Sequence, residues 1–367
     1  MNLTVNKSEF LKALQTVSKA VNPKPIIPLF SNILLEVEGD NARLSGTNFE
    51  IGISANIGIT NGGSFTTAIP AKLITDFIGA LSPEIIEMKF DKVHQSILIE
   101  TETSKNSIKC VNADDFPSVP SVENPITVNS TLFKEAIGRV AFAASQNTDR
   151  TPLDGVLIEA SDNKLIMFAT DGFHLSYEEL AFGEHELPLP ELHAIIRASN
   201  LETIARIIDE DKEIFISSPK ESNNIRFNIE GLNIVAQKLD GNFPDYRMLE
   251  PKTPTTSISI STLTLLRSCK QLELFAGNNG LVKVSIEGMN VELSTTAKEK
   301  GESKINLVII VNGMPITIGV NVFFLHEFLE ICKTPDILID FTGANAPVLL
   351  KMKDFDSYYH IIMPIGL

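Results

Sequence analysis

The feature that most constrains how this chain folds is a threefold repeat of one unit along its 367 residues. Each copy begins with a helix pattern and holds a second one in its middle, and apolar residues in these patterns are spaced by three and four. The first helices are expected at 6–20, 130–145 and 261–275, and the second helices at 71–81, 197–208 and 320–333. A period of this length indicates duplicated domains rather than a solenoid.

The three copies also end alike, with an apolar side chain directly before a proline. These endings are NADDFP at 112–117, LDGNFP at 239–244 and IIMP at 361–364. Proline-containing linkers follow the first two endings, as expected between domains. We therefore predict three domains, at residues 1–123, 124–250 and 251–367.

Short β-type runs separated by turn residues lie between the helices, for example at 32–37, 52–57, 164–169 and 306–311. Several short strands and two helices per copy predict an α+β fold. In such a fold each pair of helices packs its apolar stripes on antiparallel sheets and turns its polar faces outward. Asn6 and Glu9 have the spacing of a capping box at the start of the first helix.

The net charge of −15 argues by itself against nucleic-acid binding, because phosphate contacts need Lys and Arg. The positive charge is nevertheless segregated: the six predicted helices carry eleven Lys and Arg against seven Asp and Glu. Lys and Arg are also good helix formers, so the count leaves both interpretations open. If functional, a mildly basic helical surface on an acidic body would bind DNA weakly and without sequence preference.

A search for chemistry finds no nucleotide-binding loop, zinc-protease motif, nucleophile elbow or calcium loop. The densest set of possible metal ligands is HELPLPELH at 185–193. Pro188 and Pro190 break any helix that would align its two histidines, so we interpret it as a surface loop. We therefore expect no catalytic residue, no metal and no cofactor.

A second candidate is ATDGFHLS at 169–176, where Asp171, His174 and Ser176 have the residue types of a catalytic triad. A β-type run that leads into an Asp-Gly pair is, however, ordinary hairpin chemistry. We predict a hairpin turn at this position.

The last residues, HIIMPIGL at 360–367, are almost wholly apolar, whereas chain termini are usually polar and frayed. We expect this tail to dock or to help form an apolar groove, in which Met adapts to varied partners.

The three cysteines lie far apart, which favours a reduced protein over a disulfide framework. The first residues become polar too early for a signal peptide, and no apolar run approaches the roughly 18 residues of a membrane span. We expect a cytoplasmic protein.

Five motifs, taken in order, resemble the bacterial sliding clamp family, the β subunit of DNA polymerase III. They are GTNFEI at 46–51, ADDFP at 113–117, ATDGFHL at 169–175, KLDGNFPDYR at 238–247 and the IIMPIGL tail, so the resemblance covers the whole chain. It implies three similar clamp domains per chain and a head-to-tail homodimer that forms a ring around duplex DNA. Such a clamp has no active site and tethers the replicative polymerase, which confers processivity.

The resemblance further implies an ATP-driven clamp loader as a partner. It also implies one pocket per chain, between domains two and three, for short, partly apolar peptide motifs of the DNA polymerase III alpha subunit, repair proteins and other clamp-motif proteins. The matching pocket positions are Leu153, Thr170, Gly172, Phe173, His174, Leu175, Pro244, Arg247, Met248, Pro347, Ile361, Met363, Pro364 and Ile365.

Two further sets of residues follow from the resemblance. The DNA-facing residues would be Lys24, Arg150, Arg197, Lys12, Lys72, Lys134 and Arg139. The dimer interface would join the region of 104–111 to the region of 271–275, with Ile108, Leu272 and Leu274.

The chain departs from the family pattern at three places. His174 stands where Arg is common, so a permanent charge at the pocket rim is absent. Gly366 replaces a usual Arg, and Thr151-Pro152 replaces aromatics that face DNA in some members. Two alternatives are an acidic hydrolase, which would need converging ionisable residues, and a scaffold that binds proteins but not DNA.

Overall fold

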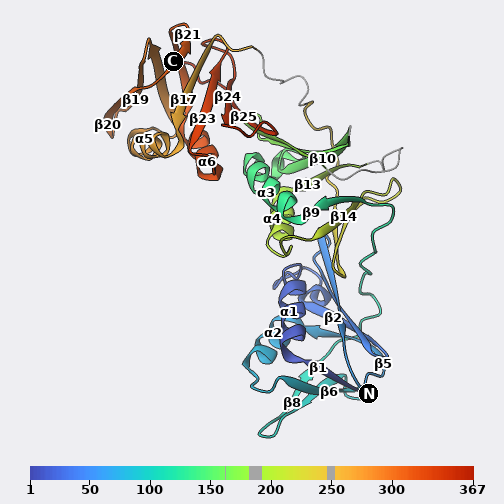
Figure 1. Cartoon of the computed structure of the whole chain (residues 1–367). Helices are drawn as coiled ribbons and strands as arrows, with labels where there is room; N and C mark the ends of the chain where they lie inside the picture. Colours follow the sequence, from blue (N-terminus) through green and yellow to red (C-terminus); the bar gives the residue numbers. More distant parts are fainter. Residues whose placement is uncertain (162, 182–191, 246–252) are drawn as a thin grey trace. The chain divides into compact units, whose positions relative to one another are not determined.

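The computed structural model describes residues 1–161, 163–181, 192–245 and 253–367 (Figure 1). These residues form two compact units. The first unit holds residues 1–131, 192 and 206–238, and the second holds the other described residues.

All six predicted helices form, with ends that differ by a few residues. They are α1 (Lys7–Ser18), α2 (Ala71–Ala80), α3 (Ser130–Val140), α4 (Ala198–Ala205), α5 (Thr262–Phe275) and α6 (Val322–Ile331). The stripe of α1 that contains Phe10, Leu14 and Val17 is buried as predicted. The Asn6 side chain accepts hydrogen bonds from the backbone N–H groups of Ser8 and Glu9, so it caps α1.

Two details of the helix predictions are wrong. The pattern at 130–145 predicts one helix, but α3 ends at Val140 and a short 3-10 turn, η2 (Ala141–Ala143), follows it. The predicted first residues of four helices lie in strands instead, namely Asn6, Arg197, Ser261 and Val320.

The first unit contains two antiparallel sheets, and α1 lies beside α2 and packs on β3 and β4 (Figure 1). The smaller sheet has the order β1 (Asn2–Asn6), β6 (Ile85–Asp91), β7 (Ser96–Glu100), β8 (Lys105–Lys109). The larger sheet has the order β5 (Ser64–Pro70), β2 (Asn32–Glu38), β3 (Asn41–Thr47), β4 (Ile51–Gly58), β16 (Leu232–Gln237), β15 (Asn224–Ile229), β14 (Glu213–Ser217), β9 (Ile126–Asn129).

The second unit also contains two antiparallel sheets, and α5 lies beside α6 (Figure 1). The larger sheet has the order β13 (His193–Arg197), β10 (Gly155–Ser161), β11 (Lys164–Thr170), β12 (His174–Ala181), β25 (Tyr358–Ile362), β24 (Val348–Met352), β23 (Asp336–Phe341), β17 (Thr256–Ser261), β21 (Val311–Gly313). The smaller sheet has the order β20 (Gly301–Val308), β19 (Asn290–Ala297), β18 (Leu281–Glu287), β22 (Ile316–Asn321).

The predicted β-type runs correspond to β2, β4 and β11. The fourth run, at 306–311, is wrong as one strand, because β20 ends at Val308 and β21 begins at Val311. Between them, Ile309 donates its N–H to the carbonyl of Met289, outside both strands.

Each large sheet joins strands from two of the predicted domains. In the first unit β4 pairs with β16, with Ile51 opposite Ala236. In the second unit β12 pairs with β25, with Leu175 opposite Ile361. This pairing explains why the two compact units do not follow the threefold repeat; the domain boundaries themselves remain a prediction.

The interior is aliphatic and aromatic, as the sequence patterns indicate. The core of residues 258–362 includes Leu265 and Leu272 of α5, Phe328 of α6 and Tyr358 of β25. Cys110, Cys269 and Cys332 are unpaired thiols. Within the described ranges, no helix combines the length and the apolar character that crossing a membrane requires.

Candidate functional site

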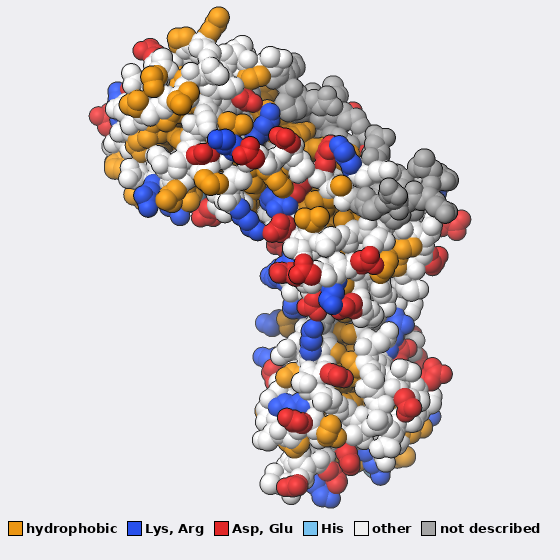
Figure 2. All heavy atoms as spheres, in the orientation of Figure 1, with side chains coloured by type: hydrophobic (Ala, Val, Ile, Leu, Met, Phe, Trp, Pro, Cys, Tyr) orange, Lys and Arg blue, Asp and Glu red, His pale blue; other side chains and the backbone are white. Residues whose placement is uncertain are grey.

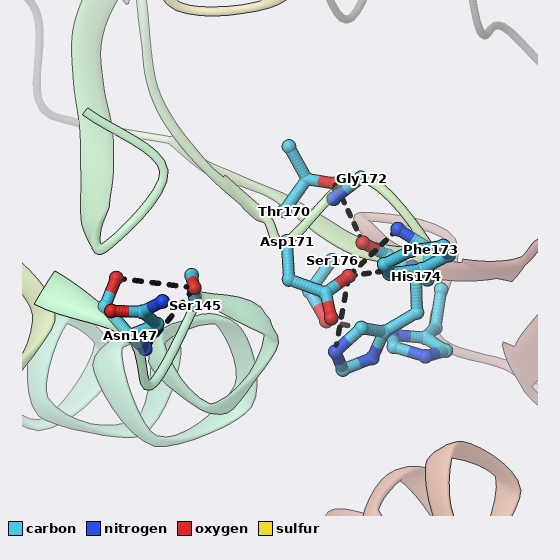
Figure 3. Close-up of polar contacts among 9 residues, drawn as sticks. Ser145, Asn147, Thr170, Asp171, Gly172, Phe173, His174 and Ser176 are labelled. Atoms are coloured by element: carbon cyan, nitrogen blue, oxygen red, sulfur yellow. Dashed lines mark hydrogen bonds and ion pairs between the residues drawn. The ribbon is translucent and has the colours of Figure 1, made fainter. Parts of the chain in front are cut away.

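The turn between β11 and β12 is held rigidly by side-chain hydrogen bonds (Figure 3). The Thr170 hydroxyl donates to the carbonyl of His174 at 2.6 Å and accepts from the N–H of Gly172 at 3.0 Å. The Asp171 carboxylate accepts from the N–H groups of Phe173 at 2.7 Å and His174 at 3.0 Å. Gly172 has a φ of +91°, which favours glycine. The predicted hairpin is therefore confirmed.

This turn presents Phe173 to solvent beside the apolar tail. Phe173 is 57 % exposed, and its ring centre lies 5.8 Å from the guanidinium carbon of Arg150. The carbonyl of Phe173 accepts a 2.8 Å hydrogen bond from the N–H of Met363, whose side chain is 40 % exposed. An apolar side chain from the turn and one from the tail thus lie on the surface at one place.

His174 lies under this surface in an aromatic environment. Its ring stacks on Phe324 of α6 with 4.0 Å between ring centres. Its Nε2 is 3.7 Å from the Asp171 carboxylate. Burial lowers the pKa of His174 below its ordinary value, and Asp171 acts in the opposite direction. The neutral form is therefore favoured at pH 7.

A second buried histidine, His360 of β25, lies 5.3 Å from His174 between ring centres. Its Nδ1 is 2.8 Å from the hydroxyl oxygen of Ser176. Burial, assisted by His174, holds the pKa of His360 well below its ordinary value. Because Ser176 contacts His360 and is fully buried, it is not placed to form a triad with Asp171 and His174.

The structure brings the predicted pocket residues that it describes into one unit. The β12–β25 pairing joins the turn to the tail, and Pro347 directly precedes β24, the next strand. Leu153 donates its N–H to the carbonyl of Arg150, and Pro244 follows Phe243, whose ring contacts Phe168. Beneath them, Leu175 and Ile361 belong to one buried cluster. Arg247 and Met248 lie outside the described residues.

A buried ion pair supports the sheet next to this site. Glu178 of β12 is fully buried, and its carboxylate accepts hydrogen bonds from Arg139 at 2.5 and 2.8 Å. Arg139 also donates to Glu135, which Lys333 contacts at 2.7 Å. Burial raises the pKa of Glu178, and Arg139 acts in the opposite direction.

Arg139 corrects one sequence prediction. The guanidinium is directed at Glu135 and Glu178, and the side chain is 9 % exposed. Its donors are therefore engaged inside the protein, and Arg139 is not part of the DNA-facing set proposed below.

The other predicted DNA-facing residues are placed variously. Lys24, Arg150 and Lys72 are exposed, and Lys134 is partly exposed. Exposed Lys12 pairs with Asp209 at 3.0 Å, whereas Arg197 pairs with buried Asp154. On the face shown in Figure 2, Lys and Arg side chains are interspersed with Asp and Glu.

The predicted dimer residues also differ from one another. Ile108 is 5 % exposed and Leu272 is 1 % exposed, so both already pack inside the chain. Leu274 is 69 % exposed. Of the three predicted residues, only Leu274 has an exposed side chain.

Residues 185–191 of the histidine-rich stretch lie outside the described residues. His193 lies in β13 with its Nδ1 3.1 Å from Glu159. Across the described part of the chain, no three His, Cys, Asp or Glu side chains are grouped as a metal would need.

Sequence reasoning missed Glu178 and His360. Glu178 carried no local signal, because every residue of β12 from His174 to Glu178 is buried and the alternation of apolar and polar residues there does not mark an outward face. Only its need for a buried partner makes it informative once the fold is known. His360 was counted with the apolar tail, although it faces the interior.

Comparison with known proteins gives three matches along the chain. Residues 1–120, 127–245 and 247–366 match the N-terminal, central and C-terminal domains of the DNA polymerase III beta subunit. The chain is 26 % identical to a beta sliding clamp of Staphylococcus epidermidis, covering 100 % of this chain and 99 % of that protein. It is 25 % identical to a beta sliding clamp of Proteus mirabilis, covering 100 % of both.

Solved structures of sliding clamps are similar to this chain over its whole length. The chain is similar to a Streptococcus pneumoniae DNA polymerase III beta chain at a TM-score of 0.92 and 25 % identity, with 100 % of both chains covered. A Pseudomonas aeruginosa sliding clamp bound to griselimycin has the same fold, with a TM-score of 0.92 and 23 % identity over 100 % of both chains.

Proposed function

The chain belongs to the DNA polymerase III beta-subunit family, and we propose that two copies close head to tail into a ring around duplex DNA. As a member of that family it is a sliding clamp, a non-catalytic subunit that makes DNA polymerase processive. The observation that carries this conclusion is the match of all three family domains, in order, over nearly the whole chain.

The mechanism is topological. A closed ring holds a polymerase near its primer without tight DNA affinity, so a few basic contacts to phosphates suffice and leave the ring free to slide. We propose Lys24, Lys72, Lys12, Lys134, Arg150 and Arg197 as the DNA-facing residues. Lys12 and Arg197 would attract DNA phosphates less strongly than the other four, because each is paired with an acidic residue of the chain.

Ring closure requires an accessible surface on each side of the interface between protomers. β8 is the last strand of its sheet, and exposed Leu274 lies near the end of α5. We propose that the β8 region of one protomer meets the Leu274 region of the other, which closes a ring by two-fold symmetry. A clamp loader would open the ring with ATP, and the unpaired cysteines fit a reducing, cytoplasmic setting.

We place the partner-peptide pocket at the surface formed by the 170–175 turn, Leu153, Pro244, Pro347 and the tail. Exposed Phe173 and Met363 supply the apolar contacts, and their hydrogen-bonded backbones fix their positions. Two pockets on one dimer would raise the effective concentration of polymerase and repair proteins at DNA.

The ring is tested by loading the protein with its loader and ATP onto nicked circular DNA and then cutting the circle. We expect retention on the circle and loss after linearisation. Equal retention on both forms would indicate ordinary DNA affinity and would contradict encirclement. No association at all, with the loader active on another clamp, would favour a scaffold that binds only proteins.

The pocket is tested by the double change Met363→Ala and Ile365→Ala. We expect griselimycin, which the Pseudomonas aeruginosa clamp binds, to lose affinity at least about tenfold, because two apolar contacts disappear. The dimer should be unaffected in size-exclusion chromatography. The matched control is Ile310→Ala with Met314→Ala, at side chains 76 % and 72 % exposed elsewhere in this unit. Unchanged affinity in the folded test variant would refute this location.

A further inference from the structure

The hairpin turn at the proposed pocket has a hydrogen-bonded twin in the first unit. The Thr47 hydroxyl donates to the carbonyl of Ile51 at 3.0 Å and accepts from the N–H of Phe49 at 3.2 Å. The Asn48 side chain accepts from the N–H groups of Glu50 at 3.0 Å and Ile51 at 2.9 Å. These are the four bonds of the 170–174 turn, position for position.

The strands around the two turns repeat as well. β4 pairs with β16 as β12 pairs with β25. The N–H of Gln237 donates to the carbonyl of Glu50 at 2.8 Å, as the N–H of Met363 donates to Phe173 at 2.8 Å. The chain therefore contains one structural counterpart of the proposed pocket. It is formed by residues 47–51 and the end of β16, and we call it the twin site.

The twin site differs from the proposed pocket in the residue at the positive-φ position of the turn. Phe49 stands where the pocket has Gly172, and both have positive φ, +75° and +91°. The Phe49 ring lies 4.3 Å from Phe30 between ring centres, and Phe116 lies 6.0 Å from Phe30. Strand registers make Phe30 the counterpart of Leu153, since Leu34 pairs with Ser45 as Leu157 pairs with Phe168.

The Phe49 ring thus covers the counterpart of a residue assigned to the pocket. The surrounding side chains also change in polarity, because Glu50 replaces Phe173 and Gln237 replaces Met363. A large residue at positive φ is an uncommon conformation, which the four hydrogen bonds of the turn hold in place.

We propose that Phe49 is the residue that closes the twin site and so limits each chain to one peptide pocket. This inference rests on the proposed pocket, because it assumes that the 170–175 turn is where partner peptides bind. Glycine at position 49 would fit the φ of the turn without strain and would uncover Phe30.

The test exchanges the two positions and counts griselimycin molecules per chain by native mass spectrometry and titration calorimetry. We expect one for the unaltered protein and none for Gly172→Phe. For Phe49→Gly with Gln237→Met we expect two, the second at least tenfold weaker because Glu50 remains. Combining all three changes should move the single site to the first unit. Val93→Gly, at an exposed turn of the same unit, is the matched control and should leave one.

The contrary result is that the unaltered protein and the folded Phe49→Gly, Gln237→Met variant each bind one griselimycin per chain at concentrations up to a thousand times the Kd of the first site. That result would overturn this inference and leave the proposed pocket standing. No binding by the unaltered protein would instead refute the proposed pocket, and with it the inference. If the glycine variant fails to fold by circular dichroism, Phe49→Asn replaces it, because Asn also tolerates positive φ.

Discussion

Replacing Arg139 with leucine should lower the free energy of unfolding by about 3–5 kcal/mol, because it leaves the carboxylate of Glu178 buried without a partner. Glu178 is fully buried and receives two hydrogen bonds from Arg139. Urea denaturation of variant and unaltered protein, followed by circular dichroism, measures the loss.

The pH dependence of this loss identifies its cause. Without Arg139, the Glu178 pKa should rise further, so the folded chain would hold a proton that the unfolded chain releases. Stability of the variant should then fall as the pH rises above the ordinary Glu pKa of about 4.3, and the fall should continue until the raised pKa of Glu178 is passed. Glu178→Leu added to Arg139→Leu should restore much of the loss, since no buried charge remains. A loss below about 1 kcal/mol, similar to that of the exposed control Lys333→Ala, would contradict this account.

Acidification should weaken the fold through His174 and His360. Burial lowers the pKa of both histidines, so they stay neutral in the folded protein while the unfolded chain protonates them below about pH 6.5. The unfolded chain then binds more protons than the folded chain. The free energy of unfolding therefore decreases by up to about 1.4 kcal/mol for each histidine and each unit by which the pH is lowered. The decline starts near pH 6.5 and ends below the lowered pKa values.

The variant His360→Asn isolates this contribution from that of the carboxyl groups. We expect its stability to decline less steeply than that of the unaltered protein between pH 7 and 5.5, as measured by urea denaturation at each pH. His94→Asn, at an exposed histidine, should keep the original slope. Parallel curves for all three proteins would show that the buried histidines do not govern acid sensitivity.

The helices could be predicted from sequence because each depends on local spacing. Phe10, Leu14 and Val17 fall on one face of α1 whatever lies beneath them, and Asn6 caps the helix from the adjacent position. The turn at Asp171 and Gly172 is equally local, since its hydrogen bonds join residues two to four positions apart.

The rest depends on contacts that local spacing does not encode. Leu175 and Ile361 are paired across the sheet although they are far apart in sequence, so the merging of neighbouring repeats was not predicted. Arg139 lies at a position that reads as an exposed helix face, and only the fold places Glu178 beside it. The residues of the pocket came from the family resemblance; neither composition nor periodicity indicated that the turn and the tail would meet.

The strand pairs β4–β16 and β12–β25 have a consequence for how the chain divides. A fragment cut between the first and central repeats would leave β4 with a row of unsatisfied backbone donors and acceptors, and β16 in the other fragment would be left in the same condition. Exposed strand edges of this kind pair with the edges of other chains and so favour aggregation. The repeated unit of the sequence is therefore not a unit that can be cut out intact, and the repeats depend on one another for solubility as well as for shape.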